Sequence, residues 1–181
     1  MEILGGSCRL GLWFVHVWWN DKTVHQVRFA RTGIPGRVPE LIRRYCAGHV
    51  VNLSQLDTPA IKEDTVYSRI YLVVQQVPYG STSTYGEIAA KAGTSPRVVG
   101  QAMARNPVPL VIPCHRIVAA DGIGGFSSPV EIKEALLAME KKRVAESGKM
   151  IPAAHHRLHG SDPPATCSRI RRPRGRIRGG S

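Results

Sequence analysis

Two apolar runs near the start of the chain are rich in β-branched and aromatic residues. They cover residues 10–19 and 24–29, with the polar turn Asn20-Asp21-Lys22 between them. Such runs on either side of a short polar turn predict a β-hairpin with one buried face.

A break follows the predicted hairpin, at Gly33-Ile34-Pro35-Gly36. The pattern of residues 39–45 then predicts a short helix, with Gly48 in the position that commonly ends one. We therefore expect residues 1–62 to form a small α+β unit, and no residue in this unit has the character of a catalytic group.

The second half of the chain has the periodicity of helices. Residues 65–76 carry an apolar stripe at helical spacing that Pro78 must end. Ser128-Pro129-Val130-Glu131 combines an N-cap residue, a proline and a glutamate, and predicts a last helix through about Lys142.

Between these helices the sequence predicts a pair of shorter ones. Thr84-Tyr85-Gly86-Glu87 fits a capping box, and the helix that it opens should stop at Gly93. Ser95-Pro96 begins a second helix that runs towards Arg105. Two short helices joined by a tight turn make a helix-turn-helix, which often binds DNA.

Length and composition are those of an ordinary globular protein. The chain has 181 residues, of which 43% are hydrophobic and 21% charged. The longest apolar run is about half the ~20 residues that a membrane-spanning helix needs, so neither membrane insertion nor secretion is expected.

Positive charge dominates and is concentrated near the end. The net charge is +12, and the segment from Lys142 onward has ten basic residues against Glu146 and Asp162. This balance favours a polyanionic partner, although a solvated tail without function is the simpler alternative. Because residues 143–181 show no apolar periodicity, we expect a disordered basic tail.

The four cysteines are Cys8, Cys46, Cys114 and Cys167, which are far apart and form no CxxC pair. This spacing indicates neither a disulfide framework nor a zinc site, and it favours a reducing compartment.

One cysteine has neighbours that suggest chemistry. The Pro- and Gly-rich stretch 106–127 is long for a loop, and in it Cys114 stands between Pro113 and His115. A neighbouring imidazole and a basic environment should lower the pKa of the thiol and make it a nucleophile. A lone buried cysteine is in most proteins a packing residue, so Cys114 taken by itself favours that interpretation. The alternative enzyme class, a cysteine hydrolase, would use a more distant histidine and an oxyanion hole.

The order of motifs in the second half narrows this choice. Tyr85, Ser95-Pro96-Arg97-Val98-Val99-Gly100, Asn106-Pro107, Ile112-Pro113-Cys114-His115-Arg116, Gly124-Gly125-Phe126-Ser127 and the segment 133–140 follow one another at close spacing. Over residues 63–142 the chain resembles the O6-alkylguanine-DNA alkyltransferases, also called methylated-DNA–protein-cysteine methyltransferases.

The resemblance implies an α+β fold in three parts. Residues 1–62 would form a small sheet domain and residues 63–142 a winged-helix-like domain with the helix-turn-helix, followed by the tail 143–181. It also implies a single-turnover reaction, in which a cysteine takes the alkyl group from O6-alkylguanine (or O4-alkylthymine) in double-stranded DNA without a cofactor.

Residue roles follow from the same resemblance. Cys114 matches the alkyl acceptor, His115 the base that acts through a water, and Glu140 the carboxylate that orients the imidazole. Asn106 would hold the active-site turn, while Tyr85 and Lys133 would lie near O6 of the guanine. Lys133 and Glu140 are two helical turns apart, so both should face the pocket.

Contacts to DNA and to the base are implied in the same way. Arg97 matches an arginine that fills the space left by a flipped-out nucleotide. The other positions implied to contact DNA or substrate are Thr84, Gly100, Ala102, Arg116, Ile117 and Ser127.

Departures from the family pattern occur near the pocket. Ser128-Pro129 stands where many members have Gly-Gly, and Phe126 where tyrosine is common. We predict no metal site, a monomer, and a cytoplasmic location, or a nuclear one in a eukaryote. The alternatives are a non-catalytic alkyltransferase-like protein, which Cys114 argues against, and a helix-turn-helix regulator.

Overall fold

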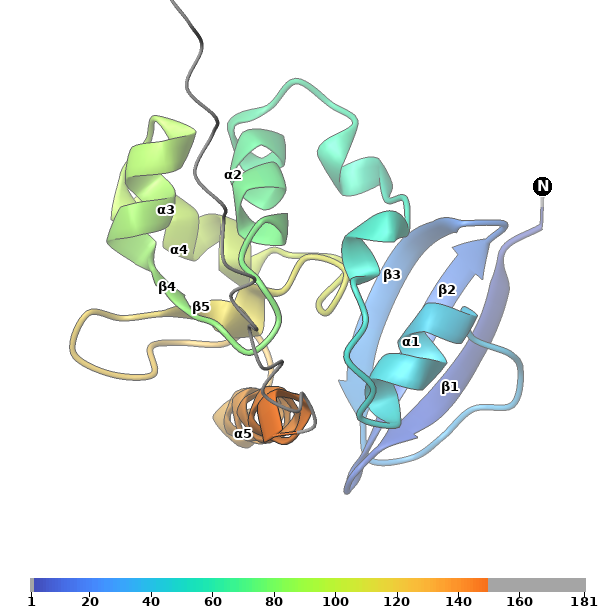
Figure 1. The fold of residues 1–181 in the computed structure, drawn as a ribbon. Helices are drawn as coiled ribbons and strands as arrows, with labels where there is room; N and C mark the ends of the chain where they lie inside the picture. Colours follow the sequence, from blue (N-terminus) through green and yellow to red (C-terminus); the bar gives the residue numbers. More distant parts are fainter. Residues whose placement is uncertain (1, 150–181) are drawn as a thin grey trace, which may run out of the picture. The chain divides into compact units, whose positions relative to one another are not determined.

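A computed structural model describes residues 2–149 (Figure 1). The order of elements is three strands, one helix, two 3-10 turns, three helices, an irregular loop and a long last helix. The predicted boundaries at residues 62 and 142 stay predictions.

The N-terminal sheet has three antiparallel strands in the order β1 (Leu4–Leu10), β2 (Trp13–Asn20) and β3 (Thr23–Ala30). The predicted hairpin corresponds to β2 and β3. Alternation along β2 buries Val15 and Val17. In β3 the buried residues Val24 and Val27 are three positions apart, because the pairing with β2 shifts register between Trp18 and Trp19.

Strand β1 was not predicted, because its sequence contains two glycines and few β-branched residues. The glycines have a packing reason. A Cβ atom at Gly6 would collide with the backbone of Arg37, and one at Gly36 with the backbone of Gly5. The chain after β3 therefore lies directly against β1.

Helix α1 (Glu40–Cys46) contacts β1 and buries Ile42 and Tyr45 (Figure 1). Short 3-10 turns at η1 (Leu53–Gln55) and η2 (Pro59–Ile61) lead to the second half.

The first three helices of the second half begin and end close to where the sequence predicts. Helix α2 (Val66–Gln75) is capped by Thr65 and ends before Pro78. Helix α3 (Tyr85–Ala92) has the complete capping box of Thr84 and Glu87, and ends at Gly93 with a φ of 64°. Helix α4 (Pro96–Ala104) is capped by Ser95 and packs against α3.

A two-stranded parallel sheet supports the irregular loop. Its strands are β4 (Ser83–Thr84) and β5 (Ile117–Val118). The 3-10 turn η3 (Cys114–Arg116) immediately precedes β5. The loop is also joined to the N-terminal sheet, because Val27 N–H donates to the carbonyl of Pro107 at 2.9 Å.

Helix α5 (Val130–Lys149) is longer than predicted. Past Lys142, Glu146 pairs with Arg143 at 2.9 Å and with Lys142 at 3.9 Å, contacts between successive turns that each support the helix weakly. The rest of the predicted disordered tail, residues 150–181, lies outside the described residues.

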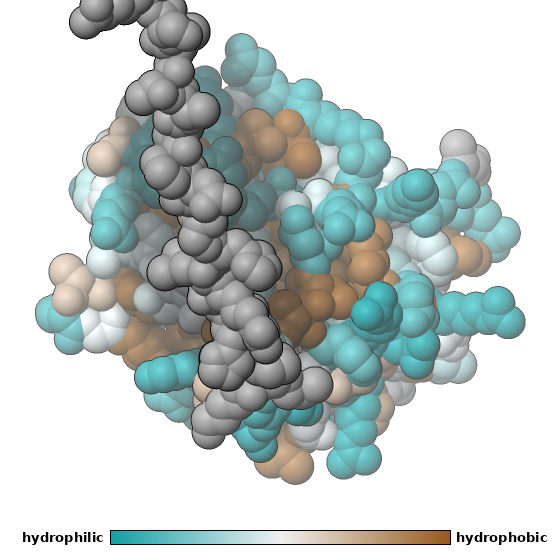
Figure 2. Space-filling model, viewed as in Figure 1, coloured by the Kyte–Doolittle hydropathy of each residue, from teal (hydrophilic) through white to brown (hydrophobic). Residues whose placement is uncertain are grey.

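Hydrophilic side chains dominate the face in Figure 2, with smaller groups of hydrophobic ones between them. No helix within residues 2–149 combines the length and apolar character needed to cross a membrane.

Candidate active site

Cys114 lies at the end of a tightly held loop. Asn106 binds this loop at two points: its Nδ2 donates to the carbonyl of Ile112 at 2.8 Å, and its Oδ1 accepts from Val108 N–H at 3.0 Å. Leu110, between them, has a φ of 79°, a left-handed conformation that non-glycine residues adopt at a cost in energy. Asn106 thus holds the turn that precedes Cys114.

The Cys114 thiol is buried, with 3% of the residue exposed. Burial raises its pKa to about 11, although a hydrogen bond with Asn106 and the charge of Lys133 act in the opposite direction. The prediction of a lowered pKa is therefore wrong for this state of the protein, because desolvation outweighs the polar neighbours. The thiol is protonated at neutral pH and must lose its proton during any reaction.

His115 and Glu140 form a fully buried pair, with Nε2 of the imidazole 2.9 Å from Oε1 of the carboxylate. Burial acts to raise the pKa of Glu140, but hydrogen bonds from His115 and Arg116 outweigh it and lower that pKa to about 2. Glu140 is therefore ionised and can only accept, which places the His115 proton on Nε2.

The other ring nitrogen of His115 is suited to act as a base. Burial lowers the pKa of His115 despite the opposing effect of Glu140, so the imidazole is neutral. Its Nδ1 is buried and has no hydrogen-bond partner within residues 2–149. A lone pair on Nδ1 is thus available for a proton.

Sequence reasoning missed Tyr45, the residue that brings the N-terminal unit into this network. Its hydroxyl donates to Glu140 Oε1 at 2.6 Å and lies 3.3 Å from His115 Nε2. The expectation that residues 1–62 contain no catalytic machinery is therefore incomplete. Only the apolar spacing of Ile42, Tyr45 and Cys46 marks this face of α1 as buried, and that spacing does not reveal a polar partner.

Arg116 differs from its predicted role at the DNA or the substrate. Its guanidinium is buried: Nε and Nη2 donate to the Glu140 carboxylate at 2.9–3.3 Å, and Nη1 donates to the carbonyl of Val77 at 2.8 Å. A buried carboxylate requires a partner charge, and Arg116 supplies it. Glu140 Oε2 also accepts from Gly80 N–H at 2.9 Å.

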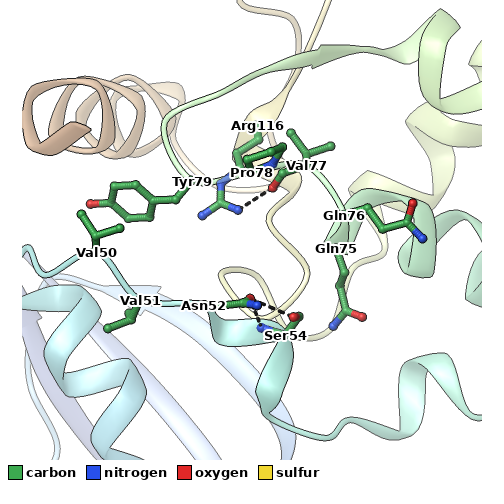
Figure 3. A pocket seen from close by; sticks show the side chains of 10 residues that line it. All are labelled: Val50, Val51, Asn52, Ser54, Gln75, Gln76, Val77, Pro78, Tyr79 and Arg116. Carbon is green, nitrogen blue, oxygen red and sulfur yellow. Dashed lines mark hydrogen bonds between the residues drawn. The ribbon is translucent and has the colours of Figure 1, made fainter. Parts of the chain in front are cut away.

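A cavity of about 560 Å³ lies on the outer side of Arg116 (Figure 3). The bond from Arg116 to the Val77 carbonyl is drawn there, beside Tyr79. Cys114 and His115 are not among the residues that line this cavity, so it is separate from the thiol.

A smaller cavity of about 270 Å³ opens onto Cys114. It is lined by Tyr85, Gly100, Met103, Ala104, Cys114, Gly125, Phe126 and Ser127. Ser127 and Tyr85 are thus at the pocket, as predicted. Burial raises the pKa of Tyr85, so its hydroxyl keeps its proton and donates to the carbonyl of Gly125 at 3.2 Å.

Lys133 and Glu140 are buried on α5 and do not line this cavity, contrary to the prediction that both face it. Instead, Lys133 Nζ joins two segments of the chain. It donates to the carbonyl of Ile117 in β5 at 2.6 Å and to the carbonyl of Gly125, in the loop at the cavity, at 3.0 Å. Burial lowers the pKa of Lys133.

The three residues of helix α4 that the sequence predicts to contact DNA differ in their exposure. Arg97 is exposed, and Gly100 has open space where a side chain would project. Ala102, by contrast, is fully buried and its carbonyl accepts from Tyr71, so its predicted DNA contact is not supported by its position. Helical spacing explains the difference, since residues 97 and 102 lie on different sides of the helix.

Two further residues that the sequence predicts to contact DNA or substrate make hydrogen bonds within the protein. Thr84 caps α3, where its Oγ1 accepts from Glu87 N–H at 3.2 Å. The Ile117 side chain is buried and its carbonyl binds Lys133. For metal ions, residues 2–149 bring together no group of three or more His, Cys, Asp or Glu side chains.

Comparisons with known proteins identify similar sequences and structures. Residues 65–142 match the family model described as 6-O-methylguanine DNA methyltransferase, DNA binding domain. A methylated-DNA–protein-cysteine methyltransferase of Methanopyrus kandleri is 45% identical over 100 residues, which are 55% of this chain and 75% of that protein. The Saccharolobus solfataricus protein of the same name is 47% identical over 77 residues, 42% of this chain and only 51% of that relative.

The structure resembles that of the O6-methylguanine-DNA methyltransferase from the archaeon Pyrococcus kodakaraensis. The TM-score is 0.60 at 28% identity, and the match covers 75% of this chain and 97% of that one. This likeness confirms the predicted α+β fold.

Proposed function

The chain belongs to the methylated-DNA–protein-cysteine methyltransferase family, and we propose that it repairs DNA by transferring the methyl group of O6-methylguanine to Cys114. The observation that carries the proposal is the buried series Cys114, His115 and Glu140 beside a cavity that opens onto the thiol. The same cavity would admit O4-methylthymine, and transfer would occur once per chain because a thioether is stable.

In the reaction, the Cys114 sulfur attacks the methyl carbon, an S–C bond forms and the bond from that carbon to O6 breaks. Because the pKa of the thiol is about 11, its proton must leave as the substrate reacts. His115 Nδ1 has the lone pair to receive it, with a water between the two groups. Glu140 stabilises the imidazolium that results, as a third member does in a hydrolase triad.

Negative charge develops on O6 of the guanine as its bond to the methyl carbon breaks. A hydrogen-bond donor and a nearby positive charge stabilise it. Tyr85 keeps its hydroxyl proton and lines the cavity, so it can donate a hydrogen bond to O6 as the bond breaks. The proton that His115 received from the thiol balances the one that the guanine takes up on release. The Lys133 ammonium favours the thiolate through its charge while holding the chain behind the cavity.

Burial of the thiol supports base flipping as part of the proposal. Only 3% of Cys114 is exposed, so a nucleotide that rotates out of the duplex into the cavity would bring its base to the sulfur. The exposed Arg97 would then occupy the space left in the duplex, and the open surface at Gly100 would let α4 approach the DNA.

The first test uses duplex DNA with a deuterated methyl group on O6 of one guanine. Mass spectrometry of peptides should place one labelled methyl per chain on Cys114. Cys114→Ser should accept none, while the control Cys46→Ser, at another buried cysteine, should retain acceptance. Label on Cys8 or Cys46, or DNA binding without transfer, would refute the proposal.

Base flipping has its own test. Arg97→Ala should slow transfer from duplex DNA at least tenfold more than transfer from the free base O6-methylguanine, which requires no flipping. The control Arg44→Ala removes an exposed arginine from α1 and should leave the ratio of the two rates unchanged. Equal slowing of both substrates by Arg97→Ala would refute the role of Arg97.

A further inference from the structure

Tyr45 is the contribution of helix α1 to the buried network around Glu140. The ring is fully buried and packs edge-on against Tyr79, with centroids 5.9 Å apart, and against His115 at 6.4 Å. Burial and the charge of Glu140 raise the pKa of Tyr45 well above its ordinary value. The hydroxyl therefore keeps its proton and donates a hydrogen bond to Glu140 Oε1.

One carboxylate oxygen serves several donors at once. Besides Tyr45 O–H, Glu140 Oε1 accepts from His115 Nε2 at 2.9 Å and from Arg116, whose Nη2 lies at 2.9 Å and Nε at 3.3 Å. A carboxylate oxygen has two lone pairs, so donors on the same atom compete for its charge. The Tyr45 hydroxyl, at 2.6 Å, makes the shortest of these four contacts and takes part of the charge that would otherwise hold the imidazole proton.

We propose that Tyr45 is a positioning residue of the transfer reaction: by sharing Glu140 Oε1, its hydroxyl limits the pull of the carboxylate on His115 and keeps the imidazole neutral, ready to accept the Cys114 proton. The inference rests on the proposed function for its link to rate, while the effect on His115 is a property of the protein alone.

Titratable and charged groups from several elements surround His115 and Glu140. Tyr45 faces it from α1, Cys114 and Arg116 flank it in η3, and Lys133 and Glu140 act on it from α5. Tyr79, in the segment before β4, faces Tyr45 and Glu140.

Within this set, Glu140 is the group that favours the imidazolium, whereas burial, Arg116 and Lys133 oppose it. Tyr45 donates a hydrogen bond to Glu140, the group that favours the imidazolium. Removing the Tyr45 hydroxyl should therefore strengthen the attraction between the Glu140 carboxylate and a protonated His115.

Tyr45→Phe isolates the hydroxyl, because phenylalanine keeps the ring that packs against Tyr79 and His115. Without the donor, Glu140 holds more charge, the imidazolium is stabilised, and a smaller fraction of His115 is neutral at a given pH. The acid limb of the profile of transfer rate against pH should move upward by roughly half a pH unit. On that limb the rate should fall about threefold, and on the high-pH plateau it should stay close to that of the wild type.

A second measurement does not depend on activity. With ¹³C-labelled histidine, the Cε1–H signal of His115, assigned with His115→Gln, should titrate at a higher pH in Tyr45→Phe than in the wild-type protein. The matched control is Tyr67→Phe, which removes a hydroxyl that binds Arg105 and not Glu140. It should leave both the pH profile and the titration unchanged.

The two measurements separate the possible failures. If the wild type transferred no methyl group, the proposed function would fail, but the titration would still test Tyr45. An unchanged titration in Tyr45→Phe would overturn the inference. So would a rate that fell equally at every pH with the midpoint fixed, since Tyr45 would then support only the packing of α1.

Discussion

The buried carboxylate of Glu140 should dominate the dependence of folding stability on pH. Its folded pKa of about 2 lies below its ordinary value of 4.5. The unfolded chain therefore binds the proton more tightly, and the group stabilises the fold at every pH above about 4.5. This stability is lost as the pH falls from about 4.5 through 2.

Two arguments give the contribution of the Glu140 charge to the free energy of unfolding. A difference of about 2.5 pKa units corresponds to about 3 kcal/mol of unfolding free energy. Removing one partner of a buried ion pair, here by Glu140→Gln, costs about 3–5 kcal/mol because Arg116 is left without its counter-charge. The agreement is expected, since protonated glutamic acid and glutamine are similar neutral groups.

The assay is urea unfolding of wild type and Glu140→Gln, followed by tryptophan fluorescence between pH 7 and pH 2.5. At pH 7 the variant should be less stable by about 3 kcal/mol, and the gap should narrow steadily below about pH 4.5. Glu134→Gln is the matched control, because Glu134 is exposed on the same helix. It should follow the wild type at every pH.

Two results would contradict this reasoning. A loss below about 1 kcal/mol at pH 7 would mean that the hydrogen bonds of Glu140 do not offset its desolvation. A gap of the same size at pH 7 and pH 2.5 would mean that the loss in Glu140→Gln comes from shape and not from charge.

Three further substitutions test other parts of the site. Asn106→Ala should lower stability by about 2–3 kcal/mol in urea unfolding and slow transfer strongly, because two buried backbone groups lose their partner; an unchanged rate would show that the turn holds itself. Lys133→Met should keep the packing of the side chain but release the carbonyls of Ile117 and Gly125, so hydrogen exchange of residues 124–127 should speed up and transfer should slow; unchanged exchange would contradict the support role. Thr84→Ala should cost about 1 kcal/mol through the lost cap of α3, visible in the melting temperature, while Ser81→Ala, in the preceding loop, should have little effect.

Local signals in the sequence were sufficient to predict the helices of the second half. The capping box at Thr84, the left-handed Gly93 and Ser95-Pro96 each act on the backbone within a few residues, so the sequence alone defines these ends. Strand β1 was missed because its two glycines are explained by contacts with residues 36 and 37, about thirty positions away.

Long-range contacts account for the errors at the site as well. The motif around Cys114 was predictable as a family pattern, but the direction of its pKa depends on burial by the assembled fold. Arg116 belongs to that motif and still points inward, because its partner Glu140 is 24 residues away. Tyr45 acts across 95 residues, a distance at which periodicity carries no information.

The same separation in sequence has a consequence for the order of folding. Contacts of high sequence separation form late, because closing a long loop costs entropy before any contact stabilises it. Helices α2, α3 and α4 pack against one another and can form early, whereas the bond from Tyr45 to Glu140 joins α1 to α5 across 95 residues. We therefore expect the group that orients His115 to come into place late in folding. A chain that emerges from the ribosome, or refolds from denaturant, should gain methyl-transfer activity later than it gains helical structure.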